Sequence, residues 1–156
     1  MKNNSIIIIS GEPYSIFFEI FFKTLKDKKF KNYKNPLILI GSKDLLIKQM
    51  EKLNYSFKIR LVNEKIINKS KLDNEKINLV DVNFKFTKVF DKISTKSSKY
   101  IENCFLKGVD LINKNLGRAI INGPISKQHF LNKRFLGITE YLSKKFNTKN
   151  KEVMLI

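Results

Sequence analysis

Ala119-Ile-Ile-Asn-Gly-Pro-Ile-Ser-Lys-Gln-His-Phe-Leu-Asn132, followed by Leu136-Gly-Ile-Thr-Glu-Tyr-Leu142, is the stretch that decides the fold. Its apolar start, residues 119–121, predicts a short strand that is buried on both faces, as in a parallel sheet. Gly123 and Pro124 end this strand, because glycine permits unusual backbone angles and proline donates no ladder hydrogen bond. The pattern therefore predicts a strand that stops at a tight turn.

Two residues after this turn are expected to begin helices. Ser126 is a favoured N-cap for a short helix through His129 and Asn132, and Thr139 is one for a second helix over residues 140–146. A strand, a tight turn and a helix start are typical of the places where α/β proteins bind ligands. Free backbone N–H groups at the amino end of a helix favour anions there.

The rest of the chain alternates short apolar runs with helical patterns, which predicts an α/β fold with a mostly parallel sheet flanked by helices. Strands are expected at residues 5–9, 36–40, 55–62 and 77–82, with Phe84 and Phe86 in a further edge strand. Helices are expected from residue 15, over 42–53 with a stop at Asn54, and over 94–115 with Gly117 at the C′ position. The charged residues 63–76 predict a surface excursion with little to bury.

The composition is that of a strongly basic globular chain. Its 156 residues are enough for one domain with a core, and no apolar run is long enough to cross a bilayer. The formal net charge is +17, but only Arg60, Arg118 and Arg134 among the 31 basic residues are arginines. Readers of nucleic-acid sequence depend on arginine, and the lysines here are dispersed, so we expect no nucleic-acid partner. The single cysteine, Cys104, agrees with a reducing compartment, and we expect a cytoplasmic protein.

Three segments carry a resemblance to a known family. Asn122-Gly-Pro-Ile-Ser-Lys127 matches a Thr/Asn-Gly/Ala-Pro-x-x-Lys turn, and Gly137-Ile-Thr-Glu140 follows it in the place of a Gly-His-Thr-Glu motif. Gly11-Glu-Pro13, with Ile16 and residues 19–20, looks like a Gly-Glu/Asp-Pro-Ala-Gly-Ile-Gly-Pro-Glu opening. In these motifs and their order the chain resembles the 4-hydroxythreonine-4-phosphate dehydrogenase family of pyridoxal phosphate synthesis.

The resemblance implies a fold shared with isocitrate and isopropylmalate dehydrogenases. It also implies oxidation of a phosphorylated hydroxy amino acid by NAD(P), followed by decarboxylation, in a homodimer with a divalent metal. The family's metal ligands are histidines of its carboxyl-terminal half, at positions that this chain does not contain. Residues 151–156 begin a further apolar run and stop, so we expect residues 1–156 to be an incomplete α/β dehydrogenase domain without an internal boundary. Alone, this chain is expected to be inactive.

The resemblance implies three substrate-binding positions: Lys127, Ile138 and Thr139. Thr139 falls on a family threonine that contacts substrate, although it also suits a helix N-cap worth about 1 kcal/mol. Lys127 falls on the family's lysine and can hold a phosphate or a carboxylate as a point charge, but it is equally typical of a solvated lysine. Ile138 stands where the family has histidine and cannot hydrogen-bond a substrate. Either the substrate differs or another residue supplies that contact.

Two loops are candidates for shaping the site, and catalytic residues are not assigned. The loop candidates are Gly11, Glu12, Pro13, Gly123 and Pro124. Glu12 is expected to organise its loop by accepting backbone N–H bonds. Bulky residues 14–18 replace the family's glycine-rich continuation, which prevents close approach of the backbone to a ligand.

The only histidine and the only cysteine are not expected to bind a metal. His129 has no second ligand motif beside it and is predicted to be a surface or half-buried residue. Cys104 lies on the apolar stripe of a predicted helix, which favours a small core residue over a nucleophile. No metal site is assigned.

Two other functions remain open at this point. The first is a divergent enzyme of the same fold that acts on another phosphorylated or acidic substrate, for which Ile138 is the motive. The second is a basic binding module without catalysis, against which the dispersed lysines count.

Overall fold

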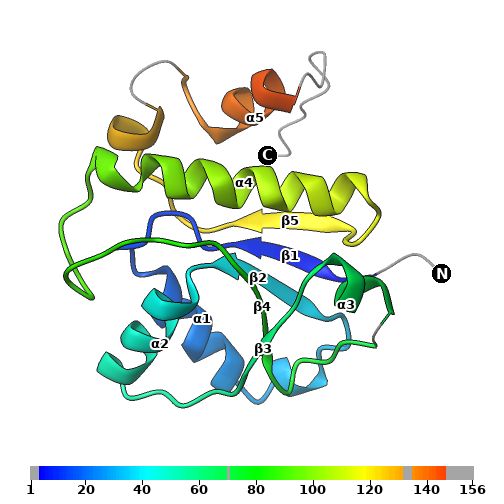
Figure 1. Cartoon of the computed structure of the whole chain (residues 1–156). Helices are drawn as coiled ribbons and strands as arrows, with labels where there is room; N and C mark the ends of the chain where they lie inside the picture. Colours follow the sequence, from blue (N-terminus) through cyan, green and yellow to red (C-terminus); the bar gives the residue numbers. More distant parts are fainter. Residues whose placement is uncertain (1–3, 70, 132–134, 147–156) are drawn as a thin grey trace.

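The computed structural model describes residues 4–69, 71–131 and 135–146, which contain a five-stranded parallel sheet in the order β3-β4-β2-β1-β5 (Figure 1). All four strand pairings are parallel. The strands are β1 (Ile6–Ile9), β2 (Leu37–Gly41), β3 (Ile59–Leu61), β4 (Ile77–Asp81) and β5 (Ala119–Asn122). The predicted α/β class with a parallel sheet is confirmed.

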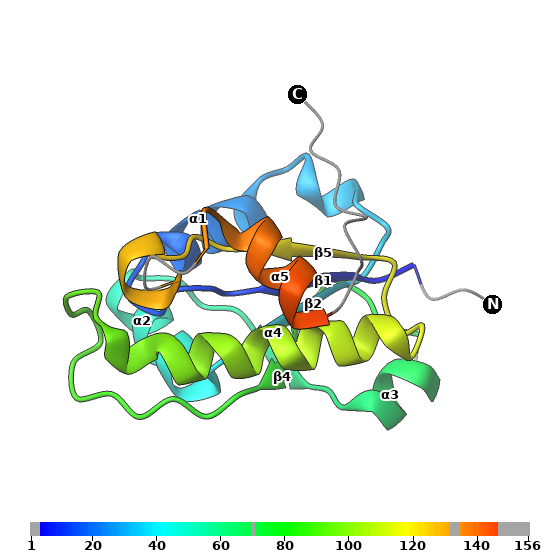
Figure 2. The same ribbon diagram turned by 90° about the horizontal axis from the view of Figure 1, so that it is seen from above.

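Helices cover both faces of this sheet, as Figure 2 shows for α1 and α4. α1 (Phe17–Lys26) and α2 (Lys43–Lys52) pack on one face, and α4 (Ser98–Asn113) packs on the other. Alternate strand residues point to opposite faces, so each face has its own core. The core under α4 contains Ile7, Ile9, Ile38 and Ile40, and the core under α1 and α2 contains Ile6, Ile8, Leu39 and Leu79. The continuous apolar runs of β1 and β2 follow from this burial on both sides.

Asparagines in the left-handed conformation end two of the helices. Asn54 follows α2 with a φ of 56°, as predicted, and Asn115 follows α4 with the same φ. The prediction that Gly117 ends α4 is wrong. Asparagine tolerates this conformation because its short side chain can hydrogen-bond locally, and Gly117 instead lies where an added Cβ would meet Ile7 Cδ1 at 2.6 Å.

Three strand predictions need correction. β5 lies at an edge of the sheet and pairs only with β1 among the described residues. None of its four residues is buried, and Ile121 is 56% exposed, so β5 is not covered on both faces. Phe84 and Phe86 are not in a strand, and the Phe84 ring packs on Tyr100 with ring centroids 4.8 Å apart. β3 is shorter than residues 55–62, because the Tyr55 and Phe57 N–H groups donate to the carbonyl and the sulfur of Met50 in α2 and do not join the sheet.

The excursion between β3 and β4 is more structured than its charge pattern predicts. It includes α3 (Glu64–Lys69) and the buried Leu72. Asp73 Oδ2 lies 2.9 Å from Arg60 Nη2, and Asn74 Oδ1 accepts a hydrogen bond from the Leu37 N–H at 2.8 Å. These long-range contacts attach the excursion to the amino ends of β2 and β3.

A further layer lies on α4. The short π-type helix η3 (Lys127–Leu131) lies over the amino-terminal end of α4, and α5 (Ile138–Phe146) lies further along it (Figure 1). The two remaining helical turns are η1 (Phe30–Asn32) and η2 (Thr95–Ser97). In the part of the chain that the structure describes, every helix is too short or too polar to cross a bilayer.

Candidate functional site

Two loops that carry predicted site residues interlock at the carboxyl edge of the sheet. The Glu12 N–H donates to the Pro124 carbonyl at 2.8 Å, and the Gly123 N–H donates to the Ile9 carbonyl at 2.7 Å. Because β1 and β5 are parallel neighbours, both loops leave the sheet at the same edge. The structure therefore brings together the loop candidates that the sequence places far apart.

Glycine is required in both loops because backbone atoms fill the space beside it. Gly11 has a φ of +73°, and a Cβ there would lie 2.4 Å from the Pro124 oxygen. A Cβ on Gly123 would lie 2.3 Å from the Ser10 oxygen. The glycines thus allow close contact between the two loops.

Two serines at the amino-terminal end of α4 contact the segments that follow β1 and β5. Ser97 Oγ lies 3.0 Å from Glu12 Oε2, and Ser98 Oγ donates to the His129 carbonyl at 3.2 Å. These adjacent serines therefore contact Glu12 of the first loop and His129 of η3, the helix that follows the second loop. Neither serine stands out in the sequence, because their partners are distant along the chain.

Tyr100, one turn into α4, joins the carboxyl ends of β1 and β2. Its hydroxyl oxygen accepts from the Ser42 N–H at 3.0 Å and shares a hydrogen bond of 2.9 Å with Ser10 Oγ. Burial raises the pKa of Tyr100 well above its usual value of 10.0, so the phenol stays neutral and keeps its proton for this bond. In the sequence Tyr100 is only one residue of the helix expected over residues 94–115, and nothing local indicates this role.

Gln49 of α2 holds the first loop from the other side of the sheet. Its Nε2 donates to the Pro13 carbonyl at 3.0 Å and to the Val89 carbonyl at 2.9 Å, and the side chain is fully buried. The loop after β1 is therefore fixed by α2 as well as by α4. Gln49 does not stand out in the sequence, because a glutamine in a helix is ordinarily a surface residue.

Glu12 lies at the centre of these contacts and is only 2% exposed. Burial, the largest effect, raises the pKa of Glu12 above its usual value of 4.5, and the Ser97 hydroxyl, the Tyr14 N–H and His129 offset only part of this rise. The prediction that Glu12 accepts backbone N–H bonds agrees with the contribution of Tyr14. Its main hydrogen-bond partner is nevertheless a side chain, Ser97.

The helix after the second loop begins as predicted. Ser126 Oγ accepts from the His129 N–H at 3.2 Å and lies 2.9 Å from His129 Nδ1, so Ser126 acts as an N-cap. His129 is half-buried, and Lys127 is exposed at the start of η3. Lys127 therefore reaches solvent beside the joined loops, where it is accessible to an anionic ligand.

The motif at α5 is placed differently from the expectation. α5 begins at Ile138, and the Tyr141 N–H donates to the Gly137 carbonyl at 3.3 Å, so Gly137 and not Thr139 occupies the N-cap position. Glycine is tolerated there, which leaves Thr139 half-buried in the first turn. Ile138 is half-buried and packs against the core under α4. No hydrogen bond between described residues joins Thr139 to Lys127 or to either loop.

Aromatic rings attach α5 and η3 to α4. The centroid of the Tyr141 ring lies 5.1 Å from that of the Phe130 ring and 6.2 Å from that of the Phe105 ring, in edge-to-face arrangements. An ion pair of 2.7 Å between Lys145 and Glu102 adds a polar contact between α5 and α4. The position of Thr139 relative to the loops thus depends on packing around Tyr141.

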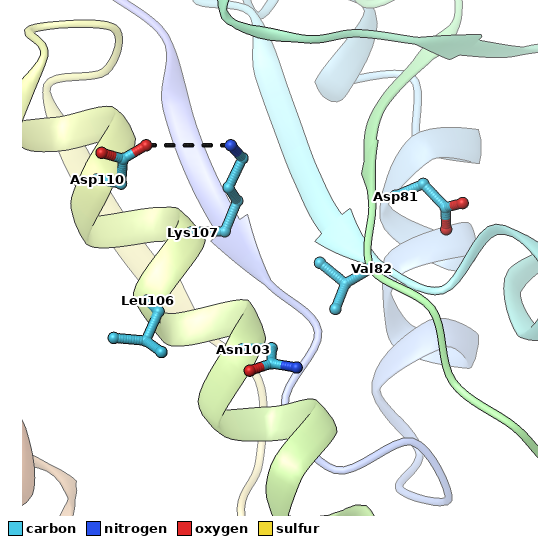
Figure 3. A pocket seen from close by; sticks show the side chains of 6 residues that line it. All are labelled: Asp81, Val82, Asn103, Leu106, Lys107 and Asp110. Carbon is cyan, nitrogen blue, oxygen red and sulfur yellow. Dashed lines mark ion pairs between the residues drawn. The ribbon is translucent and has the colours of Figure 1, made fainter.

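A separate surface pocket between the end of β4 and α4 does not have the features of a ligand site (Figure 3). It has a volume of about 400 Å³ and is lined by Asp81, Val82, Asn103, Leu106, Lys107 and Asp110. Its charged groups already have protein partners: Asp81 accepts from the Lys43 N–H, Lys107 pairs with Glu64, and Asp110 pairs with Lys114. The joined loops remain the better candidate.

The described residues do not fit a catalytic metal. No three His, Cys, Asp or Glu side chains of residues 4–69, 71–131 and 135–146 lie close enough to hold an ion. Cys104 is fully buried in the core under α4, and burial raises its pKa to about 12, so it is neither a thiolate ligand nor a nucleophile. The prediction of a small core residue is confirmed for Cys104.

The chain is similar to a known protein family and to solved structures. Residues 32–156 match the family model described as pyridoxal phosphate biosynthetic protein PdxA. The chain resembles the solved 4-hydroxythreonine-4-phosphate dehydrogenases of Burkholderia phymatum (19% identity, TM-score 0.76) and Klebsiella pneumoniae (18% identity, TM-score 0.70). It covers 43% and 44% of those chains, which in turn cover 90% of this one. No curated protein matches the chain.

Proposed function

Because the chain belongs to the PdxA family of pyridoxal phosphate biosynthetic proteins, we propose that it supplies the substrate-binding part of an NAD(P)-dependent dehydrogenase. The substrate is a phosphorylated hydroxy amino acid, of which 4-hydroxythreonine 4-phosphate is the first candidate. The chain spans less than half the length of the solved structures that it resembles. The activity, the cytoplasmic location and the homodimer are therefore proposed for the whole enzyme, in which this chain forms part of one α/β domain.

The observation that supports this proposal most strongly is the direct hydrogen bond between Glu12 and Pro124, which joins two motif loops at the carboxyl edge of the sheet. Parallel sheets bind ligands at this edge, where loops from neighbouring strands meet. Lys127 is exposed beside the joined loops and provides a cation for a phosphate or a carboxylate. Thr139 provides a hydroxyl from the first turn of α5.

In this proposal the chain's own residues bind and orient the substrate. The Lys127 ammonium holds the anionic group, and the Thr139 hydroxyl donates to or accepts from a polar group of the substrate. NAD(P) would accept the hydride, and a metal would polarise the oxygen that becomes the ketone. The described residues contain no group of three metal-ligating side chains, so we assign the metal, and with it the oxidation, to parts of the enzyme beyond them.

A second candidate is an enzyme of the same fold with another phosphorylated or acidic substrate. Its support is Ile138, which packs against the core under α4 instead of presenting a hydrogen-bonding side chain. Such a pocket still attracts an anion through Lys127, but it cannot make the contact that the family's histidine would make. A basic binding module without catalysis has less support, because several lysines are engaged in ion pairs with neighbouring carboxylates.

Calorimetric titration of the purified chain tests the proposal. The ligands are 4-hydroxythreonine 4-phosphate, unphosphorylated 4-hydroxythreonine and inorganic phosphate, each with wild type, Lys127→Ala and the control Lys52→Ala. Lys52 is exposed on α2, so its loss changes net charge equally without affecting the loops. A hydrogen bond to a charged group is worth about 1.5–3 kcal/mol, so Lys127→Ala should weaken binding of the phosphorylated ligand roughly ten- to hundredfold. Equal affinity of Lys127→Ala and Lys52→Ala for 4-hydroxythreonine 4-phosphate would contradict the proposal that Lys127 holds the phosphate.

A further inference from the structure

Glu12 has an unusual set of contacts for a carboxylate. Its side chain is 2% exposed, and Oε1 is buried without a hydrogen-bond partner among the described residues. Oε2 has one side-chain contact, at 3.0 Å from Ser97 Oγ. A buried carboxylate normally accepts several hydrogen bonds, because losing hydration of the anion is costly.

Counting the hydrogens at Ser97 shows which group carries the proton. Ser97 Oγ also lies 2.9 Å from the Ser94 carbonyl oxygen, which can only accept a hydrogen bond. A serine hydroxyl has one hydrogen, so it cannot donate to Ser94 and to an ionised Glu12 at the same time. Both contacts become hydrogen bonds if Glu12 Oε2 carries a proton and donates it to Ser97 Oγ.

Few charged groups face Glu12 from the elements packed around it. His129 of η3 favours the anion when it is protonated, and the Tyr14 N–H of the same loop also favours the anion. Burial raises the pKa of the Tyr14 phenol, and the negative charges of Asp91 and of an ionised Glu12 raise this pKa further. Burial outweighs these effects, so the pKa of Glu12 lies above its usual value.

We propose that Glu12 is a positioning residue that works as a neutral carboxylic acid, with its Oε2–H donating to Ser97 Oγ. Through this bond the amino end of α4 fixes the loop whose backbone N–H holds Pro124, and so fixes the turn that leads to Lys127. Loss of the proton leaves Ser97 with two acceptors and one hydrogen, and the loop then loosens from α4. The consequence of this loosening for substrate binding at Lys127 rests on the function proposed above. The protonation state of Glu12 does not depend on that function.

The first test is a titration of the intact chain by NMR, with ¹³C-labelled glutamate side chains. Glu75 is the internal reference, because it is exposed between α3 and β4. We expect the Glu12 carboxyl carbon to titrate at a higher pH than that of Glu75, and the amides of Gly123 and Lys127 to shift with the Glu12 midpoint. A Glu12 midpoint at or below that of Glu75 would overturn the proposal. So would loop amides that do not follow Glu12.

The second test compares melting temperatures of wild type, Glu12→Gln and Glu75→Gln across the same pH range. Glutamine stays neutral and still offers an N–H donor to Ser97. Because the folded-state pKa of Glu12 is raised, its contribution to stability is present at low pH and is lost as pH rises through that pKa. The melting temperature of Glu12→Gln should therefore exceed that of wild type increasingly as pH rises, whereas Glu75→Gln should show no such trend. If the difference in melting temperature between Glu12→Gln and wild type does not change with pH, the proposal that Glu12 is a neutral carboxylic acid is contradicted.

Discussion

The Glu12 N–H donates to the Pro124 carbonyl at 2.8 Å, which joins the loop after β1 directly to the turn after β5. The two loops come from distant parts of the chain and meet only because β1 and β5 are paired in the sheet. Their contact has consequences for stability, and these can be measured apart from any activity.

Gly11→Ala should destabilise the chain. Alanine at a φ of +73° is strained by about 1–3 kcal/mol, and its Cβ would meet the Pro124 oxygen at 2.4 Å. The free energy of unfolding of both variants would be measured by chemical denaturation. Gly137→Ala is the matched control, because a Cβ there meets only the flexible end of Glu140. We expect a loss of about 2 kcal/mol or more for Gly11→Ala and of about 1 kcal/mol or less for Gly137→Ala, which replaces an N-cap glycine by the less suitable alanine. Similar losses for both variants would mean that the loops are not packed as described.

The carboxyl end of α4 provides a second test of backbone geometry. Asn115→Gly should leave stability within about 1 kcal/mol of wild type, because glycine adopts the left-handed conformation without strain. Gly117→Ala should cost about 1–3 kcal/mol, because its Cβ would overlap the buried Ile7 side chain. Denaturant midpoints in the opposite order would contradict both the left-handed conformation of Asn115 and the close contact of Gly117 with Ile7.

Cys104 should be unreactive in the folded chain. With a pKa of about 12 instead of 9.0, its thiolate fraction at neutral pH is on the order of a thousandfold smaller. Alkylation with iodoacetamide, followed by mass spectrometry, should proceed only at the rate of unfolding and should become fast in denaturant. Rapid modification without denaturant would place Cys104 outside the core.

The sequence predicted the sheet well and the contacts of the site poorly. Continuous apolar runs such as residues 6–9 identify strands that are buried on both faces, and Asn54 is a local stop signal. Ser97 and Gln49 could not be recognised, because their partners Glu12 and Pro13 are distant in sequence. Local capping rules describe only neighbours within one helical turn.

Local patterns also explain why the predictions for β5 and for the N-cap of α5 are wrong. An apolar run indicates a buried strand but not how completely other elements cover its two faces, and Ile121 of β5 is 56% exposed. A threonine before a helical pattern indicates a cap only to within a residue or two, and here Gly137 takes the position. Lys127 and Thr139 stay predicted substrate contacts.

Ile138→His should lower stability without restoring a family-like site. Ile138 packs against the core under α4, and burying a polar ring there without a partner costs about 1–3 kcal/mol. Ile16→His is the control, because Ile16 is 64% exposed on the surface before α1. Chemical denaturation and affinity for 4-hydroxythreonine 4-phosphate would be measured together. Unchanged stability with at least about tenfold tighter binding would refute the idea that this pocket is built around an apolar side chain.

Mapping the bound ligand by NMR tests the central claim most directly. Amide resonances of the chain would be followed while 4-hydroxythreonine 4-phosphate is added. We predict saturable shifts at the amides of residues 11–12, 122–123, 125–127 and 138–139, which would place the ligand at the joined loops and the start of α5; Pro13 and Pro124 have no amide proton. Shifts confined to the pocket between Asp81 and Asp110, or no saturable shifts at all, would contradict the account.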